Sequence, residues 1–227
     1  MTSSAAVSSV LIRCQGILFD MDGVLISSLG GVERSWAKWA KMRGVDIARA
    51  REIAHGRRAV DVLAMLCPDL DSEVELKLIE EIEVRDNEGL TALPGVPELL
   101  AALPRDRWTV VTSATERLAR VRLAAGRIPV PERLVTADQV TAGKPHPQPY
   151  LTGSALLGFR PEECLVFEDS SSGAQAGRAA GCTVVATTFS HPIDVLDAAH
   201  YVVRDLTGVE VQSTSKGLAL RLTPVAG

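Results

Sequence analysis

The chain has 227 residues, and its proportions of hydrophobic residues (46%) and charged residues (23%) are ordinary for a globular protein. This length can hold one large domain, or a core domain with a smaller insert. The formal net charge of −4 argues against nucleic acid as a partner, because proteins that bind it present a basic face. No apolar run reaches the ~18 residues that a membrane span needs, so we expect no membrane partner.

The first residues and the cysteines indicate the compartment. Residues 1–9 are rich in Ser and Ala but lack the cationic start and apolar centre of a secretory signal, so we expect a frayed tail. The cysteines have no close pairing, which suits reduced thiols, and at least three of them look like small core residues. They are Cys14, Cys67, Cys164 and Cys182. We therefore expect a cytoplasmic protein.

Apolar or β-branched runs alternate with helical patterns along most of the chain. The predicted strands are Leu11–Phe19, Trp108–Thr112, Arg133–Thr136, Cys164–Phe167 and Thr183–Ala186, with Val202–Val203 as an edge strand and Gly217–Leu222 as a further short strand. The predicted helices between them are Pro97–Leu103, Glu116–Ala125, Pro147–Leu157 and Gly173–Ala180. This alternation predicts an α/β fold with a Rossmann-like parallel sheet and helices on both faces.

One segment interrupts the alternation. Between about Ser28 and Leu90 the apolar residues follow helical spacing, and no strand pattern occurs. The segment Thr91–Gly95 leads back to the core, and Pro97 suits the start of a helix. We therefore predict a helical cap domain at residues 28–90, inserted into a core formed by residues 1–27 and 91–227.

Polar side chains follow the ends of several predicted strands. They are Asp20 and Asp22 after the first strand, Ser113 after the second, Lys144 in a loop fixed by one Gly and two Pro, and Glu168 and Asp169 after a later strand. The carboxyl ends of parallel strands form the edge at which ligands bind. Two carboxylates spaced one residue apart repel each other, so Asp20 and Asp22 need a cation or a proton nearby.

These residue types meet the needs of phosphoryl transfer. A carboxylate can attack phosphorus to form an aspartyl phosphate. A second carboxylic acid can protonate the leaving oxygen and later deprotonate water. Mg²⁺ prefers oxygen ligands, and charge on the transferred group is met by metal, lysine and hydroxyl donors. The residue types alone do not say which aspartate attacks.

Four motifs, in this order and over nearly the whole chain, resemble those of the haloacid dehalogenase-like superfamily of phosphotransferases. They are Asp20-Met21-Asp22-Gly23-Val24, Ser113, Lys144 and Glu168-Asp169. Residues 111–115, 143–151 and 166–169 more narrowly resemble its sugar-phosphate phosphatases of the 2-deoxyglucose-6-phosphatase and glycerol-phosphatase type, which carry a helical cap after the first motif. The resemblance implies a Mg²⁺-dependent phosphatase for a small sugar or polyol phosphate.

The resemblance also implies a role for each core motif residue. Asp20 would be the nucleophile, and Asp22 the general acid and base. Ser113 and Lys144 would bind the phosphoryl oxygens, and Lys144 would also neutralise Asp20.

The same resemblance implies a Mg²⁺ site. Asp20 would be one ligand, and Asp22 would contribute its backbone carbonyl. Asp169 would complete the site, with Glu168 beside it or acting through water.

Three residues of the predicted cap are candidates for substrate binding. His55 and Arg57 lie in a polar loop that contains a glycine, and this loop resembles the substrate-specificity loop of capped relatives, where a basic side chain reaches the sugar or phosphate. A solvated basic turn explains the two residues equally well. Trp36 lies three residues before Trp39 on a predicted helix, and such pairs more often pack in a core than line a cleft.

Plainer interpretations of the core motifs remain. Asp20 and Asp22, like the pair Glu168-Asp169, would also suit helix capping, although the four ordered motifs favour the catalytic interpretation. Thr112 competes with Ser113 as the functional hydroxyl, and the match to the motif favours Ser113.

Two other functions share these residues. A mutase resembling β-phosphoglucomutase forms the same phosphoaspartate, but such relatives carry a Thr and a His where this chain has Ser28 and Val32. A non-catalytic binder of phosphorylated ligands would leave the catalytic side chains without a role. A cap of ~60 residues suits a small phosphorylated metabolite rather than a folded phosphoprotein, and we expect a monomer. Most capped relatives carry an Asp where this chain has Ser27, and nothing in the sequence explains that change.

Overall fold

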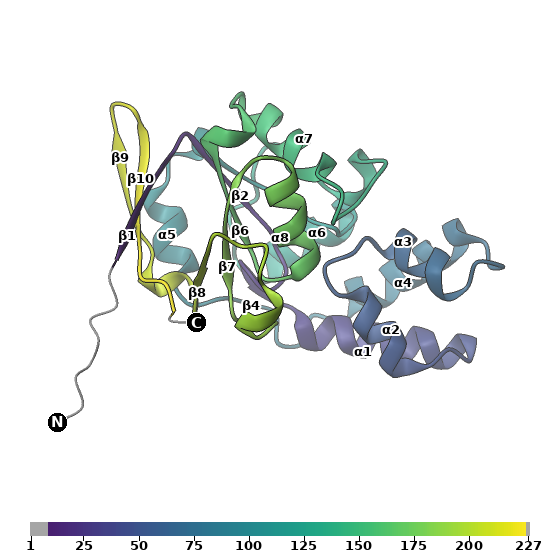
Figure 1. Ribbon diagram of the computed structural model, residues 1–227. Helices are drawn as coiled ribbons and strands as arrows, with labels where there is room; N and C mark the ends of the chain where they lie inside the picture. The colour runs from purple at the N-terminus through teal and green to yellow at the C-terminus, as the bar shows by residue number, and fades with distance from the viewer. Residues whose placement is uncertain (1–8, 226–227) are drawn as a thin grey trace.

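A five-stranded parallel sheet forms the centre of the protein in the computed structural model, which describes residues 9–225 (Figure 1). The strand order is β5-β2-β6-β7-β8, and every neighbouring pair is parallel. The strands are β2 (Gly16–Phe19), β5 (Trp108–Val110), β6 (Cys164–Glu168), β7 (Thr183–Thr187) and β8 (Tyr201–Val203). The predicted α/β fold is confirmed, whereas the frayed tail falls, apart from Ser9, outside the described residues.

Helices cover both faces of this sheet. They are α5 (Val96–Ala102), α6 (Glu116–Ala125), α7 (Gln148–Leu157) and α8 (Ser171–Ala179), each within two residues of its predicted bounds. Successive residues of β2 point to opposite faces, as in any strand. Ile17 and Phe19 belong to the apolar cluster that includes α5 and α6, and Leu18 belongs to the one that includes α7 and α8.

The prediction of one strand over Leu11–Phe19 is wrong, because the chain changes sheets at Gln15. Strand β1 (Val10–Cys14) pairs antiparallel with β10 (Gly217–Leu222), which also pairs with β9 (Glu210–Thr214). Buried and exposed residues alternate along β1, whereas all of β2 is buried. Alternation is typical of an antiparallel sheet with one solvated face, and continuous burial is typical of a parallel one.

The predicted strand Arg133–Thr136 is also wrong. Only one bridge forms there, between Val135 and Val111, and a 3-10 turn at Ala137–Gln139 follows directly. Val202–Val203 and Gly217–Leu222 are confirmed as β8 and β10.

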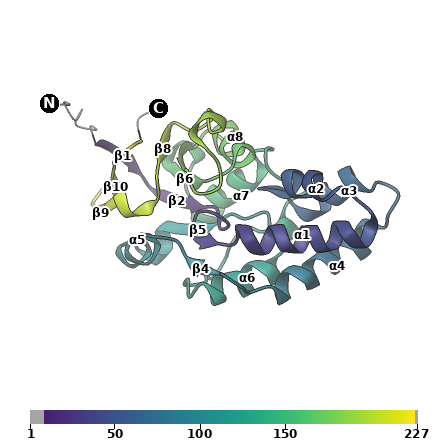
Figure 2. The same cartoon turned by 90° about the horizontal axis from the view of Figure 1, so that it is seen from below.

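Four helices lie in the chain between two short strands, and Figures 1 and 2 show them together beside the core. The helices are α1 (Leu29–Arg43), α2 (Ile47–Ala54), α3 (Ala59–Leu66) and α4 (Ser72–Arg85), and the strands are β3 (Ile26–Ser27) and β4 (Thr91–Ala92). The two strands pair antiparallel, so the chain enters and leaves the helical unit along one ribbon. The helices enclose an apolar cluster of their own, with Trp39, Leu63 and Ile79 fully buried. We propose residues 28–90 as a cap domain on this basis.

A buried carboxylate ties α1 to α4 inside the cap. Trp39 donates its indole N–H to Glu75 Oε2 at 2.8 Å, and Arg43 donates to both carboxylate oxygens at 2.8 and 2.9 Å. The Arg43 guanidinium holds the pKa of Glu75 below its usual range. The ion pair between Arg43 and Glu75, together with the Trp39 hydrogen bond, therefore joins α1 and α4 in addition to the apolar cluster of the cap.

All four cysteines are free, and the expectation for them is confirmed. Cys14, Cys164 and Cys182 are buried, whereas Cys67 is partly exposed. Burial raises the pKa of each of the three buried thiols to about 12, so they act as small core residues.

Candidate active site

A cavity of about 230 Å³ lies where the carboxyl ends of β2 and β5 meet the cap helices. The core contributes Asp20, Asp22 and Ser113 to its lining, and the cap contributes Trp36 and His55 among others. Figure 2 shows α4 of the cap beside α6 of the core, which closes one side of this space. The carboxyl-terminal edge of the sheet, where the sequence motifs lie, therefore faces a pocket between core and cap.

Lys144 is buried between two carboxylates. Its ammonium donates to Asp20 Oδ1 at 2.6 Å, to Glu168 Oε1 at 2.7 Å and to the Val111 carbonyl at 3.2 Å. Burial on its own would lower the pKa of Lys144, but the Asp20 and Glu168 carboxylates outweigh it and raise that pKa well above its usual range. Burial raises the pKa of Asp20, and Lys144 opposes that rise. The lysine therefore stays charged and neutralises part of the acidic cluster.

Hydrogen bonds occupy both oxygens of Glu168. Besides Lys144, the Tyr150 hydroxyl donates to Oε1 at 2.7 Å. The backbone N–H groups of Asp169 and Ser170 donate to Oε2 at 2.9 and 3.1 Å, and the Ser170 hydroxyl does so at 3.0 Å. Burial would raise the pKa of Glu168, but Lys144 lowers it overall. Glu168 thus holds Lys144, Tyr150 and Ser170 in place. Because both of its oxygens already accept hydrogen bonds, it is better suited to contact a metal through water than directly.

Asp169 is held from two sides. The Ser190 hydroxyl donates to Asp169 Oδ2, and His55 Nε2 of the cap lies 3.6 Å from the same oxygen. His191 Nδ1 lies 3.0 Å from the Asp169 carbonyl oxygen, and its ring meets the His55 ring edge-on at 4.5 Å. The predicted cap loop therefore reaches the predicted metal site.

The carboxylates fit a Mg²⁺ ion. Asp20, Glu168 and Asp169 each offer an oxygen, and these oxygens lie within 4.8 Å of one another. All three are buried, and Lys144 supplies one positive charge against the three negative charges of their ionised forms. Excess buried negative charge is costly without a cation, and hard oxygen donors suit Mg²⁺.

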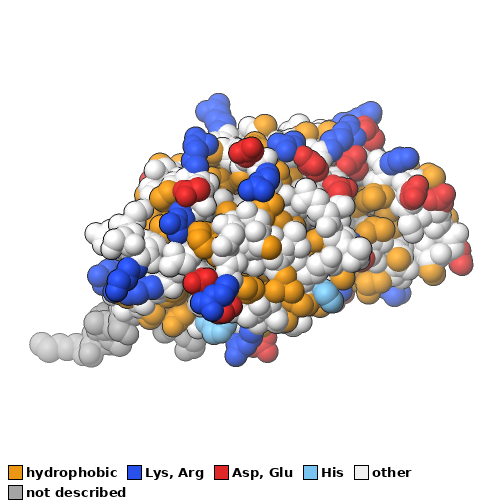
Figure 3. Space-filling view, turned by 90° about the horizontal axis from the view of Figure 1, so that it is seen from above, with side chains coloured by type: hydrophobic (Ala, Val, Ile, Leu, Met, Phe, Trp, Pro, Cys, Tyr) orange, Lys and Arg blue, Asp and Glu red, His pale blue; other side chains and the backbone are white. Residues whose placement is uncertain are grey.

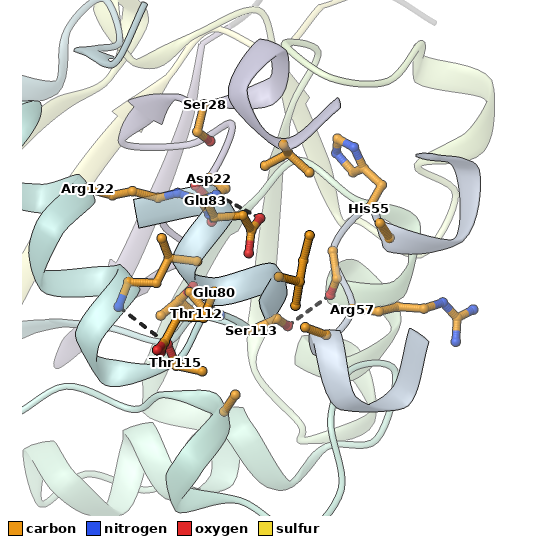
Figure 4. A pocket seen from close by; sticks show the side chains of 18 of the residues that line it. Asp22, Ser28, His55, Arg57, Glu80, Glu83, Thr112, Ser113, Thr115 and Arg122 are labelled. Atoms are coloured by element: carbon orange, nitrogen blue, oxygen red, sulfur yellow. Dashed lines mark hydrogen bonds and ion pairs between the residues drawn. The ribbon is translucent and has the colours of Figure 1, made fainter. Parts of the chain in front are cut away.

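Asp22 lies at the rim of the same cluster. Its Oδ2 accepts a hydrogen bond from Arg122 Nη1 at 2.9 Å. Its Oδ1 is buried and has no hydrogen-bond partner within residues 9–225. Figure 4 shows Asp22 beside Glu83 of the cap, with Arg122 reaching toward both.

Ser113 and Thr112 occupy different settings after β5. The Ser113 hydroxyl is partly exposed in the cavity and donates to the Gly56 carbonyl of the cap at 2.9 Å. Thr112 is buried, and its hydroxyl accepts from the Ala114 N–H at 3.1 Å. Ser113 is therefore the hydroxyl better placed to meet a ligand.

The candidate cap residues reach the cavity to different degrees. Trp36 lines it and also packs edge-on against Trp39 at 5.6 Å. Arg57 lines it as well, but Figure 4 shows its guanidinium pointing away from Asp22 and Ser113. The next residue, Arg58, is buried and donates to the Val140 and Thr141 carbonyls at 2.7 and 3.1 Å.

Sequence reasoning missed several residues of this region. They are Glu83 and Arg122, while Arg58 and Tyr150 lie within motifs that the sequence did mark but received no role there. One signal was present for Arg122, which lies four residues after Leu118 and so shares the buried face of α6. A charged side chain on such a face needs partners, and those partners come from segments far away in the chain.

Comparisons with known proteins identify the family. The model of the haloacid dehalogenase-like hydrolases matches residues 14–181, so this chain belongs to that family. Hexitol phosphatase A of Escherichia coli (strain K12) is 38% identical over 210 residues, which cover 90% of this chain and 97% of that protein. Glycerol-1-phosphate phosphohydrolase 1 of Saccharomyces cerevisiae is 38% identical over 192 residues, which cover 78% of this chain and 77% of that protein.

The solved structures agree with this assignment. A hydrolase from Pseudomonas syringae is similar with a TM-score of 0.76 at 26% identity, over 85% of this chain and 94% of that one.

Within the part of the chain that the structure describes, no helix combines the length and apolar character that crossing a membrane requires.

Proposed function

We propose that this protein is a Mg²⁺-dependent phosphatase that hydrolyses a small sugar or polyol phosphate through a phosphoaspartate at Asp20. The observation that carries the proposal is the buried Lys144, which bridges Asp20 and Glu168 beside the carboxylate of Asp169. The similarity to hexitol phosphatase A and to glycerol-1-phosphate phosphohydrolase 1 supports the class of substrate.

The first chemical step transfers the phosphoryl group to Asp20. A carboxylate oxygen of Asp20 bonds to phosphorus while the bond from phosphorus to the ester oxygen breaks. Asp22 donates a proton to that oxygen, and the free alcohol leaves. Ser113 and Lys144 donate hydrogen bonds to the phosphoryl oxygens, where negative charge is concentrated.

The second step releases phosphate. Asp22, now deprotonated, takes a proton from a water molecule whose oxygen bonds to phosphorus while the bond to Asp20 breaks. Asp20, Asp169 and the Asp22 carbonyl would hold Mg²⁺, with Glu168 acting through water. When bound, Mg²⁺ neutralises charge on the phosphoryl group and on the carboxylates around it.

The cavity and the surface support a small metabolite as the partner. A volume of about 230 Å³ closed by the cap suits a phosphorylated sugar or polyol. On the face shown in Figure 3, basic and acidic side chains are interspersed rather than gathered into one basic patch. The free cysteines suit the reducing cytoplasm.

A panel of hexitol, glycerol and sugar phosphates, assayed with and without Mg²⁺, tests the proposal. We expect phosphate release that EDTA abolishes and that Asp20→Asn lowers by a factor of about 10³ or more, because the nucleophile is lost. Trapping by beryllium fluoride at Asp20 would identify the phosphorylated oxygen. Full activity of Asp20→Asn would contradict the proposal.

The same assays separate hydrolysis from isomerisation. Val32, which replaces the His of the mutases, lines the cavity with an apolar side chain and so favours a phosphatase. Conversion of β-glucose 1-phosphate to glucose 6-phosphate without phosphate release would show a mutase instead.

A further inference from the structure

Arg122 is a buried arginine that joins the core, the cap and Asp22. It lies on α6, and only 5% of its surface is exposed. Its Nη1 lies 2.9 Å from Asp22 Oδ2, and its Nη2 lies 3.1 Å from Glu83 Oε1 on α4 (Figure 4). One guanidinium thus binds a carboxylate of the core with one nitrogen and a carboxylate of the cap with another.

The two oxygens of Asp22 differ in what they contact. Oδ2 is held by Arg122, whereas Oδ1 is buried without a hydrogen-bond partner in the described part of the chain. Asp22 and Arg122 both line the cavity. A buried acceptor without a partner is costly, so Oδ1 is the atom suited to meet a proton of a ligand or of water.

Burial restricts how the arginine itself can move. The guanidinium is planar, and its nitrogens point in fixed directions, so binding two carboxylates fixes its orientation. Because Glu83 belongs to the cap, this orientation depends on α4 packing against α6.

We propose that Arg122 is a positioning residue: it fixes Asp22 through Oδ2 and thereby directs Oδ1 toward the oxygen that gains or loses a proton. Glu83 completes the arrangement from the cap, so proton transfer is efficient only when the cap is packed on the core. This inference rests on the proposed phosphatase function and adds to it a residue that does not touch the phosphoryl group.

Arg117 provides a matched control on the same helix. It pairs with two other carboxylates of α4, Glu80 at 3.0 Å and Glu81, and half of its side chain is exposed. Within residues 9–225 it forms no hydrogen bond or ion pair with Asp22. Arg117→Leu therefore removes ion pairs between cap and core and leaves Asp22 as it is.

The test is a double-mutant cycle. Arg122→Leu is made in the wild type and in Asp22→Asn, with Arg117→Leu as the control. Arg122→Leu leaves the buried carboxylate of Glu83 without its counter-charge. The double variant Arg122→Leu, Glu83→Gln is therefore prepared as well, because it also removes that carboxylate. Thermal unfolding shows that each variant is folded before kcat and KM are measured on the best polyol phosphate of the panel.

We expect Arg122→Leu to lower kcat by about 10²-fold with little change in KM, since proton transfer contributes factors of this size. In Asp22→Asn the same substitution should lower kcat by less than about threefold, because the group that it positions is already absent. Arg117→Leu should keep kcat within about threefold of the wild type, because Asp22 keeps its partner, and the loss of the contacts between Arg117 and the cap should appear in KM.

A second substrate distinguishes positioning from a general structural role. The p-nitrophenolate of p-nitrophenyl phosphate leaves readily without a proton, so its pre-steady-state burst should survive in Arg122→Leu while transfer from the polyol phosphate slows. Equal losses in the rate of phosphoryl transfer from both substrates, or the same loss of kcat in the wild type and in Asp22→Asn, would overturn the inference. A wild type without Mg²⁺-dependent phosphate release would refute the proposed function, and this inference with it.

Discussion

At the scale of single residues, the site depends on charges that are buried together. Lys144 lies within 2.7 Å of two carboxylates, and all three groups are almost completely shielded from water. Such a group of charges is stable only while each charge has its counter-charge, because the alternative is an isolated ion in a medium of low polarity. The same arrangement that stabilises this part of the fold also prepares the nucleophile.

Lys144→Met is expected to affect stability and activity together. Asp20 and Glu168 would lose their shared cation, and removing one partner of a buried ion pair destabilises a protein by about 3–5 kcal/mol. We expect kcat/KM to fall at least 10³-fold, since a donor to the phosphoryl group is also lost. Urea unfolding and the phosphatase assay measure the two effects. Unchanged activity with reduced stability would show that Lys144 has only a structural role.

The residues found from the sequence share one property. Asp20, Ser113, Lys144 and Asp169 follow one another in the chain in an order typical of the family, and each adjoins a strand end or a loop that Gly and Pro mark. Arg122 has no such marker, and its partner Asp22 lies 100 residues away. Long-range pairing of this kind is visible only once the fold brings the segments together.

At the scale of secondary-structure elements, pairing with distant segments decides where a strand begins and ends when the local sequence does not. Residues 11–19 form one largely apolar run, yet the chain leaves the first strand at Gln15, whose N–H donates to the Glu163 carbonyl at 2.7 Å. The strand that pairs with β1 is β10, which follows some 200 residues later, so no local signal places the break. The helices of the core, by contrast, were predictable because their amphipathic patterns are local.

Gly173, at the start of α8, is required because the Glu168 side chain leaves no room for a Cβ, and not because of its backbone conformation. A Cβ at this position would lie 1.7 Å from Glu168 Oε1, which leaves no room for it. Gly173→Ala should therefore displace Glu168 and Lys144, lower activity strongly and destabilise the protein by about 1–3 kcal/mol. Alanine favours a helix by about 1 kcal/mol, so the steric effect must outweigh that gain.

Gly31→Ala is the control for this substitution. Gly31 also lies near the start of a helix, α1, and a Cβ there would meet its nearest atom, the Asp86 carbonyl oxygen, at 3.6 Å. This is an ordinary contact, so the helix preference of alanine should leave stability unchanged or slightly higher. A melting temperature of Gly173→Ala as high as that of Gly31→Ala would contradict the steric argument.

The contact between α1 and α4 predicts a dependence of stability on pH. Arg43 and Trp39 hold the pKa of Glu75 below its ordinary value of about 4.3. The stabilisation is therefore fully present above that ordinary value and is lost as the pH falls through the lowered pKa of the folded state. Glu75→Gln should cost roughly 1–2 kcal/mol at pH 7.

Urea unfolding of the wild type and Glu75→Gln, measured from pH 7 down to pH 3, checks this prediction. The difference in free energy of unfolding should stay constant above about pH 5 and narrow below pH 4. Other carboxylates titrate in the same range, but they are common to both proteins and cancel in the difference. A difference that grew as the pH fell would contradict the sign of the pKa change.

At the scale of the whole molecule, the cap has an apolar cluster separate from the two of the core, and polar contacts join the two units. Arg58 binds two backbone carbonyls of the loop that precedes Lys144, and Arg117 and Arg122 bind carboxylates of α4. Polar contacts of this kind can break and re-form without exposing a core, as a cap that admits a substrate requires. The sequence predicts a helical insertion between residues 28 and 90, but it does not predict the contacts that this insertion makes with the core.

Arg58→Met is expected to weaken closure of the cap for every substrate alike. The variant loses the hydrogen bonds to the Val140 and Thr141 carbonyls that join cap and core, and also the ion pair with Asp61 within the cap. The packed arrangement therefore becomes a smaller fraction of the population. We expect KM to rise about tenfold across the whole phosphate panel, because binding needs the closed form. Small-angle scattering should show a larger radius of gyration than that of the wild type.

Arg85→Leu serves as the matched control for Arg58→Met. Arg85 is an exposed arginine of the cap that pairs within its own helix with Glu81, so its loss should change neither KM nor the radius of gyration. If Arg58→Met raised KM for some substrates and left others unchanged, Arg58 would act by contacting the substrate. Such a selective effect would contradict a role in closure, since a change in the closed population must affect every ligand that binds the closed form by the same factor.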